Sequence, residues 1–195
     1  MNETGAGGDR VEAMQIRDAV AADAGAACEV MRRSIAELCV ADHHNDPAIL
    51  ARWLSNKTPE IVRSWIAQPV NSLLVAIAGG SLLAVGSVTD AGEITLNYVS
   101  PDARFRGVSR AMLGALEVRA AERGNVRCRL TSTETARRFD QAAGYIEDSD
   151  REIRHELGLS DVENSDGARF LIFARAASRE LGPECCSLSP ARNIE

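Results

Sequence analysis

Cysteine, histidine and lysine are scarce in this chain. Its 195 residues include five cysteines, three histidines and one lysine, Lys57. An odd number of irregularly spaced cysteines argues against a disulfide framework, and no pair has the spacing of a zinc site. We therefore expect no metal, and we expect Cys28, Cys39 and Cys128 to be small core residues in a reducing cytoplasm.

Long apolar runs and excess positive charge are also missing. No stretch of 18 apolar residues is present, and the first ten residues, MNETGAGGDR, contain no apolar signal core. The net charge of −6 argues against a general nucleic-acid-binding protein. We expect a cytoplasmic protein without nucleic-acid or membrane partners, either a monomer or a homodimer.

What the chain does contain is enough apolar sequence for one core. Hydrophobic residues make up 45% of it, which suits a single domain of this length. We expect a disordered tail over residues 1–13, one domain over 14–177 and a loose tail over 178–195.

The hydrophobic pattern predicts an α/β fold with a mixed, mostly antiparallel sheet of about seven strands and four helices. Gly79-Gly80 and Asp90-Ala91-Gly92 are tight turns between strands of a meander. Strands are expected at residues 14–17, 72–78, 82–89, 93–100, 126–130, from 145, and 170–174. Helices are expected at residues 23–40, 47–67 in two pieces, 107–123 and 133–143.

The stretch Val99–Leu113, VSPDARFRGVSRAML, is the most informative part of the sequence. A strand ends at a proline, a loop carries two arginines, and a helix begins at Gly107. Residues 101–138 hold nine arginines against four acids, so a basic island lies within an acidic protein. A helix start has free N–H groups and partial positive charge, and could therefore bind a pyrophosphate. A capped helix with surface arginines is the alternative.

Two motifs resemble those of the GNAT superfamily of N-acetyltransferases. Arg104, Gly107 and Ser109 occupy the fixed positions of its motif A, [Q/R]-x-x-G-x-[G/A], with serine where glycine or alanine is usual. The segment ARRFDQAAGY, residues 136–145, resembles the later motif A-x-x-F-Y-x-x-x-G-F. The order of elements from residue 14 to about 175 also resembles the family.

The resemblance implies a V-shaped cleft between residues 93–100 and 126–132, with acetyl-coenzyme A as co-substrate. The pantetheine arm is expected along the first strand and the pyrophosphate at the helix start. The implied cofactor-binding residues are Tyr98, Val99, Ser100, Arg104, Arg106, Gly107, Val108, Ser109, Arg110, Ala111 and Ser132.

Glu93 and Tyr98 are the implied catalytic residues. A glutamate eleven residues before Arg104 resembles the general base of the histone-acetyltransferase branch, although Glu93 could equally flank a turn. The later motif normally supplies a tyrosine as general acid, but this chain has Asp140 there. An ionised aspartate cannot donate a proton, so Asp140 is either idle or holds the acceptor ammonium, and Tyr98 is the other tyrosine near the cleft.

The sequence thus predicts transfer of an acetyl or short acyl group from acetyl-coenzyme A to a primary amine by direct attack. A non-catalytic coenzyme-A-binding module and a nucleotide-phosphate-binding protein are the alternatives, although no G-x-x-x-x-G-K-[ST] loop is present. His43 and His44 are expected in a solvated loop near the acceptor pocket, with Trp53 and Trp65 as core or pocket wall. The acidic stretch 147–168 is expected to be a solvated loop.

Overall fold

A computed structural model describes residues 13–147 and 171–176. Within these residues the sheet has seven strands in the order β1-β2-β3-β4-β5-β7-β6. All neighbouring strands are antiparallel except β4 and β5, which are parallel. The strands are β1 (Gln15–Asp18), β2 (Asn71–Ala78), β3 (Ser81–Thr89), β4 (Glu93–Val99), β5 (Arg127–Ser132), β6 (Ile146–Glu147) and β7 (Leu171–Ala176).

Six α-helices occur within the described residues, so the expectation of four was too low. The additional helices arise because the 47–67 region forms two separate helices, each beginning at a proline, and because a four-residue helix follows Cys39. The helices are α1 (Ala24–Leu38), α2 (Val40–His43), α3 (Pro47–Leu54), α4 (Pro59–Ile66), α5 (Val108–Glu122) and α6 (Glu134–Ala142).

Local sequence explains the two proline-started helices. Asp46 accepts hydrogen bonds from the amides of Ala48 and Ile49, and Thr58 accepts one from the amide of Ile61. Each proline follows its capping residue at the first helical position, where its missing N–H costs nothing.

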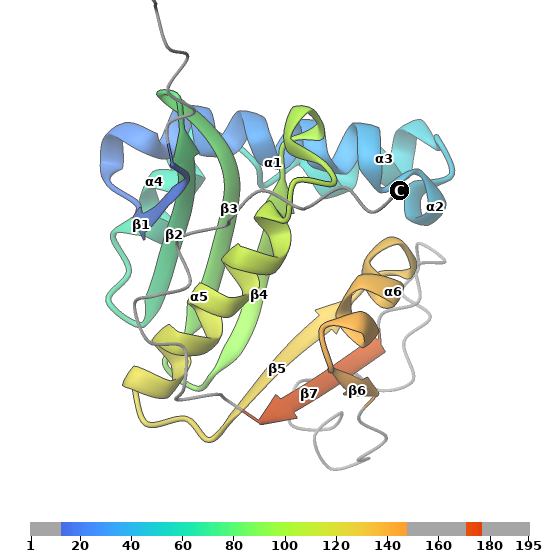
Figure 1. Cartoon of the computed structure of the whole chain (residues 1–195). Helices are drawn as coiled ribbons and strands as arrows, with labels where there is room; N and C mark the ends of the chain where they lie inside the picture. Colours follow the sequence, from blue (N-terminus) through green and yellow to red (C-terminus); the bar gives the residue numbers. More distant parts are fainter. Residues whose placement is uncertain (1–12, 148–170, 177–195) are drawn as a thin grey trace, which may run out of the picture.

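Helices cover both faces of the sheet (Figure 1). Along β2, Leu74 and Ala76 pack into the core beneath α5, whereas Leu73 and Val75 pack into the core beneath α1 and α4. This two-sided burial explains why the segment LLVAIA, residues 73–78, is apolar throughout and does not alternate.

The sheet splits between β4 and β5. Only two residue pairs join these strands, Glu93 with Arg129 and Ile94 with Leu130. Beyond Ile94 the strands separate, and β5 continues with β7, β6 and α6 as an arm that diverges from β1–β4 (Figure 1). The register of β4 on β3 also shifts near this point, because Val88 faces Ile94 while Ser87 faces Leu96. Thr95 is therefore an extra residue in β4 that has no partner on β3, as in a β-bulge.

Helix α6 is tied to its neighbours at both ends. At its N-terminus the buried carboxylate of Asp42, from α2, accepts hydrogen bonds from the amides of Glu134 at 2.8 Å and Thr135 at 3.3 Å. At its C-terminus Arg110, from α5, donates to the carbonyl of Ala142 at 3.0 Å. These bonds hold the diverging arm in a fixed position relative to the rest of the sheet.

Other sequence-based expectations have mixed outcomes. His43 is 1% exposed, with Nε2 donating to the carbonyl of Ile35 and Nδ1 accepting from the amide of Asn45, so it is not in a solvated loop. Cys28, Cys39 and Cys128 are buried free thiols.

Within the described part of the chain, no helix has the length and apolarity to cross a membrane, and no cluster of metal-ligating side chains is found. Nearly all of the predicted N-terminal tail and of the acidic stretch, and the whole predicted C-terminal tail, lie outside the described residues.

The packing of α5 on β3 depends on a glycine. A Cβ atom at Gly86 would lie 2.7 Å from Sδ of Met112 and 2.9 Å from Leu116. We expect Gly86→Ala to lower the free energy of unfolding by about 1–3 kcal/mol through overpacking. Gly25→Ala is the matched control, because its Cβ would meet nothing within 4 Å in α1 and alanine favours helix. Chemical denaturation would measure both, and equal stabilities would contradict the predicted packing.

Candidate functional site

A cavity of about 510 Å³ lies where β4 and β5 separate. It is lined by residues of α1, α3, β4, the loop after β4, the first turn of α5, β5 and α6. Along β4 every residue from Ile94 to Val99 lines it. Within the described residues, this part of β4 has β3 on one side and no strand on the other, so its free edge offers backbone N–H and C=O groups to whatever fills the cavity.

One end of the cavity is an anion-binding helix start. Gly107 is the N-cap of α5 with φ of 75°, and no side chain caps the helix. The first helical hydrogen bond runs from the amide of Ala111 to the carbonyl of Gly107 at 3.0 Å. The first amides of the helix therefore have no carbonyl acceptor in a preceding helical turn. These are the amides of Val108, Ser109 and Arg110. A Cβ on Gly107 would meet nothing within 4 Å, so the space in front of these amides is open.

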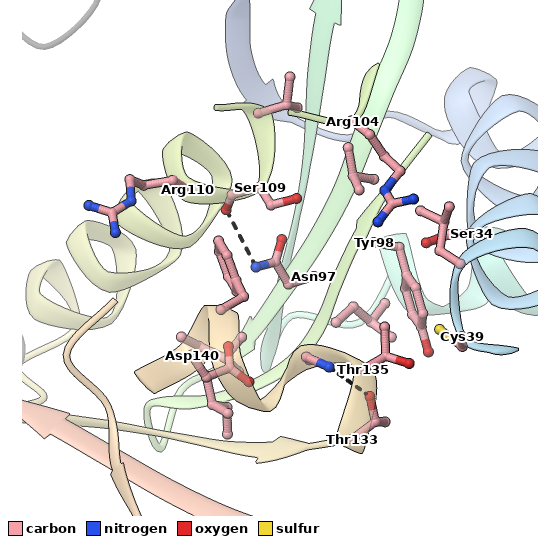
Figure 2. Close-up of a pocket in the computed structure, with 18 of the residues that line it drawn as sticks. Ser34, Cys39, Asn97, Tyr98, Arg104, Ser109, Arg110, Thr133, Thr135 and Asp140 are labelled. Carbon is pink, nitrogen blue, oxygen red and sulfur yellow. Dashed lines mark hydrogen bonds between the residues drawn. The ribbon is translucent and has the colours of Figure 1, made fainter. Parts of the chain in front are cut away.

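The arginines around this end differ in their roles. Arg104 and Arg110 line the cavity, whereas Arg106 is exposed and does not line it. In Figure 2 the Arg104 side chain extends toward Ser34 and Tyr98, while Arg110 points away from the cavity. The bond from Arg110 to Ala142 explains that orientation.

Asn97 connects the free edge of β4 to this helix start. Its Nδ2 donates to the carbonyl of Ser109 at 3.4 Å, as Figure 2 shows. Its Oδ1 is buried and has no hydrogen-bond partner within the described residues. Sequence reasoning missed Asn97, because a polar residue in an alternating strand is ordinarily a surface residue.

Tyr98 lies on the opposite wall, against the α1 layer. In Figure 2 its hydroxyl points toward the sulfur of Cys39. Burial raises the pKa of Tyr98 to about 12, with a smaller contribution from Cys39 and Asp42. The hydroxyl is therefore protonated at neutral pH and can donate a hydrogen bond.

Asp140 is a buried carboxyl group that faces the cavity. It is 4% exposed, and Ser132 donates to its Oδ2 at 2.5 Å. Burial raises the pKa of Asp140, and the bond from Ser132 opposes that shift only in part. No cation contributes to the shift, so within the described residues this carboxyl has no positive partner.

Four of the sequence-predicted cofactor residues do not line the cavity: Ser100, Arg106, Ala111 and Ser132. The amide of Ser100 bonds to Leu83 on β3, and that of Ala111 bonds within α5. Ser132 is 1% exposed and donates a hydrogen bond to Asp140, so its contact with the cofactor stays a prediction. The cavity does bring together the others: Tyr98, Val99, Arg104, Gly107, Val108, Ser109 and Arg110.

Glu93 is also outside the cavity lining. It begins β4 at the closed end of the V, opposite Arg129, and its amide donates to Oγ1 of Thr89 at 3.1 Å. Glu93 is thus the first residue of β4 and directly follows the turn Asp90-Ala91-Gly92. Its role as a general base stays a prediction.

Comparison with known proteins agrees with this geometry. Residues 37–162 match the model of a family described as the acetyltransferase (GNAT) domain. A search among curated proteins gives no significant match.

Several solved structures share the fold. PaiA N-acetyltransferase from Thermoplasma acidophilum, in complex with coenzyme A, has a TM-score of 0.68 at 16% identity, covering 84% of this chain and 98% of its own. A GCN5-related N-acetyltransferase from Rhodopseudomonas palustris has a TM-score of 0.68 at 18% identity, covering 87% and 99%.

N-acetylglutamate synthase from Neisseria gonorrhoeae, complexed with coenzyme A and N-acetyl-glutamate, has a TM-score of 0.60 at 18% identity. The match covers 85% of this chain and 35% of that protein. The family match spans more than half of the chain, and the fold, split sheet and open helix start agree with it. The chain therefore belongs to the GNAT acetyltransferase family, whose co-substrate is acetyl-coenzyme A.

Proposed function

We propose that this protein transfers an acetyl group from acetyl-coenzyme A to a primary amine by direct attack in a ternary complex. The observation that supports this most strongly is the cavity along the free edge of β4, with an open helix N-terminus at one end and the buried carboxyl of Asp140 on its wall. Two of the structural relatives named above were solved with coenzyme A bound.

The residues present fit this co-substrate. The free amides of Val108, Ser109 and Arg110 would bind the pyrophosphate, with Arg104 adding charge. The free edge of β4 up to Tyr98 and Val99 would hydrogen-bond the pantetheine amides. Acetyl-coenzyme A supplies the acyl group as a thioester, and attack by the amine forms a C–N bond and breaks the C–S bond.

Asp140 is suited to receive the acceptor. Buried charges are stable only when paired, and the ammonium group of an amine would provide the missing partner for this carboxylate. A raised pKa also makes Asp140 a better base than an ordinary aspartate. Between ammonium and amide the acceptor nitrogen loses two protons. We propose that Asp140 takes one and passes it to solvent, while the other ends on the coenzyme A thiol.

Tyr98 has a different role in this proposal. With a pKa near 12, its hydroxyl would transfer a proton uphill to a thiolate whose own pKa is about 8.5. If the Tyr98 hydroxyl donates a hydrogen bond and keeps its proton, this free-energy cost does not arise. We therefore propose that Tyr98 donates a hydrogen bond to the charge that develops on the reacting thioester, either on its oxygen or on the leaving sulfur.

Cofactor binding can be tested at two glycines of the same helix. Gly107 and Gly124 flank α5, have φ of 75° and 88°, and each has open space where a Cβ atom would lie. Alanine at either should cost about 1–2 kcal/mol of stability, because both conformations are left-handed. Only Gly107→Ala should also weaken coenzyme A binding, by about tenfold or more in calorimetry, since its methyl group enters the phosphate space. Equal affinities in the two variants would argue against this phosphate site.

The two carboxylates can be compared by steady-state kinetics with a working amine. We expect Asp140→Asn to lower kcat/KM by about 10²-fold or more and Glu93→Gln to leave it within about twofold. The carboxylate form of Asp140 is required, so wild-type activity should fall as pH drops through its raised pKa, and this limb should be lost in Asp140→Asn. The opposite ranking of the variants would restore Glu93 as the base. Absence of turnover with any amine, despite coenzyme A binding, would indicate a non-catalytic module.

Stability should respond to Asp140 in the opposite direction from activity. Its folded-state pKa is raised, so the folded state favours the neutral form and loses stability as pH rises through that pKa. Asp140→Asn should therefore be more stable than the wild type at pH 7–8, and the difference should shrink as pH falls through the raised pKa of Asp140. Asp102→Asn is the control with the opposite sign, because Arg33 lowers the pKa of Asp102. Thermal unfolding across pH would show a destabilised Asp140→Asn if the carboxylate is instead held by a cation.

A further inference from the structure

Phe105 is the most exposed large hydrophobic residue in the described part of the chain. Its side chain is 94% exposed, against 76% for Val126, the next most exposed in that group. A phenyl ring at this exposure contributes almost no packing to the fold. It also lines the cavity, beside Gly107.

The backbone at Phe105 is strained as well. Its φ is 59°, in the left-handed region. The other described non-glycine residues there are His44 and Asn45, which are types that tolerate it, whereas a bulky residue is an outlier. A glycine would occupy this conformation freely. The fold therefore gains nothing from a phenylalanine here, and strain of this kind is typical of ligand-binding segments.

The neighbours of the ring point to a ligand with both an anionic and a flat apolar part. The guanidinium carbon of Arg104 lies 4.6 Å from the ring centroid, a cation–π contact. Arg106 follows in sequence, and the open helix start begins two residues later. The ring thus lies next to the phosphate-binding amides, on the loop that precedes them.

We propose that Phe105 is a stacking platform for the adenine base of coenzyme A. This inference rests on the proposed function, which places the thioester near Asp140 and Tyr98 and the pyrophosphate at the start of α5. The adenosine is attached to the far side of that pyrophosphate and must therefore leave the cavity past this loop. Bases stack on exposed aromatic rings, and an arginine on one face of the ring leaves the other face free for the base.

The test compares ligands that have or lack the base, by calorimetry on the intact protein. Coenzyme A and dephospho-coenzyme A both carry adenine, whereas 4′-phosphopantetheine does not. For Phe105→Gly we expect about tenfold weaker binding of the first two, equal to about 1.4 kcal/mol, and binding of the third within about twofold of the wild type. Phe105→Leu should behave similarly, and Phe105→Trp should bind as tightly as the wild type.

Other results would overturn the proposal. Equal weakening for all three ligands would do so, because the ring would then act on the pantetheine arm or on the loop shape. Unchanged binding in Phe105→Gly would overturn it too, and a change in oligomeric state would assign the ring to a contact between copies. The melting temperature of ligand-free Phe105→Gly should not fall, since the ring is exposed and glycine relieves the strain. No coenzyme A binding by the wild type would refute the proposed function itself.

Discussion

The free edge of β4 is the feature on which the rest of the site depends. A strand inside a sheet ordinarily satisfies its N–H and C=O groups on both sides, and β4 does so only as far as Ile94. From Thr95 onward its second edge faces a cavity, and unpaired backbone groups there are stable only if water or a ligand meets them. The pantetheine arm, a chain with amide groups, is chemically matched to such an edge. The β-bulge at Thr95 begins where the pairing with β5 ends.

The separated parts of β4 and β5 need other supports, because in the described part of the chain these strands are paired only at Glu93–Arg129 and Ile94–Leu130. Asp42 supplies one by capping the N-terminus of α6 from α2, and Arg110 supplies another by bonding the C-terminus of α6 from α5. The cap is a charge-assisted bond to helix amides within a buried site, which is among the stronger polar contacts. Arg110 consequently uses its guanidinium to hold the frame, which explains why its side chain points away from the cavity that it lines (Figure 2).

Sequence reasoning predicted most of the elements and the open helix start at Gly107, because both depend on local signals. Alternation, turn glycines and the Arg104–Gly107–Ser109 spacing are all short-range patterns. The sequence did not show that Glu93 lies at the closed end of the V, because that position depends on where β5 stops pairing with β4. It also did not show the contacts of Asp42, Asn97 and Ser132, because these contacts depend on how distant parts of the chain fold together. Their hydrogen-bond partners are 92, 12 and 8 residues away in sequence, and no local sequence pattern predicts such contacts.

The departure from the family pattern at residue 140 has a physical explanation within this site. A tyrosine hydroxyl at this position would be neutral at pH 7 in any environment. An aspartate is charged in water, so in a buried site it is either shifted toward its neutral form by desolvation or paired with a cation. The structure shows the first condition: Asp140 is buried, is supported by Ser132 and has no cation beside it among the described residues. A carboxyl group in that state attracts an ammonium ion more strongly than a phenol would, because pairing removes the cost of burial. In the proposed mechanism, replacement of tyrosine by aspartate would therefore move the function of this position from the leaving thiolate toward the incoming amine, and it would leave Tyr98, across the cavity, as the neutral donor.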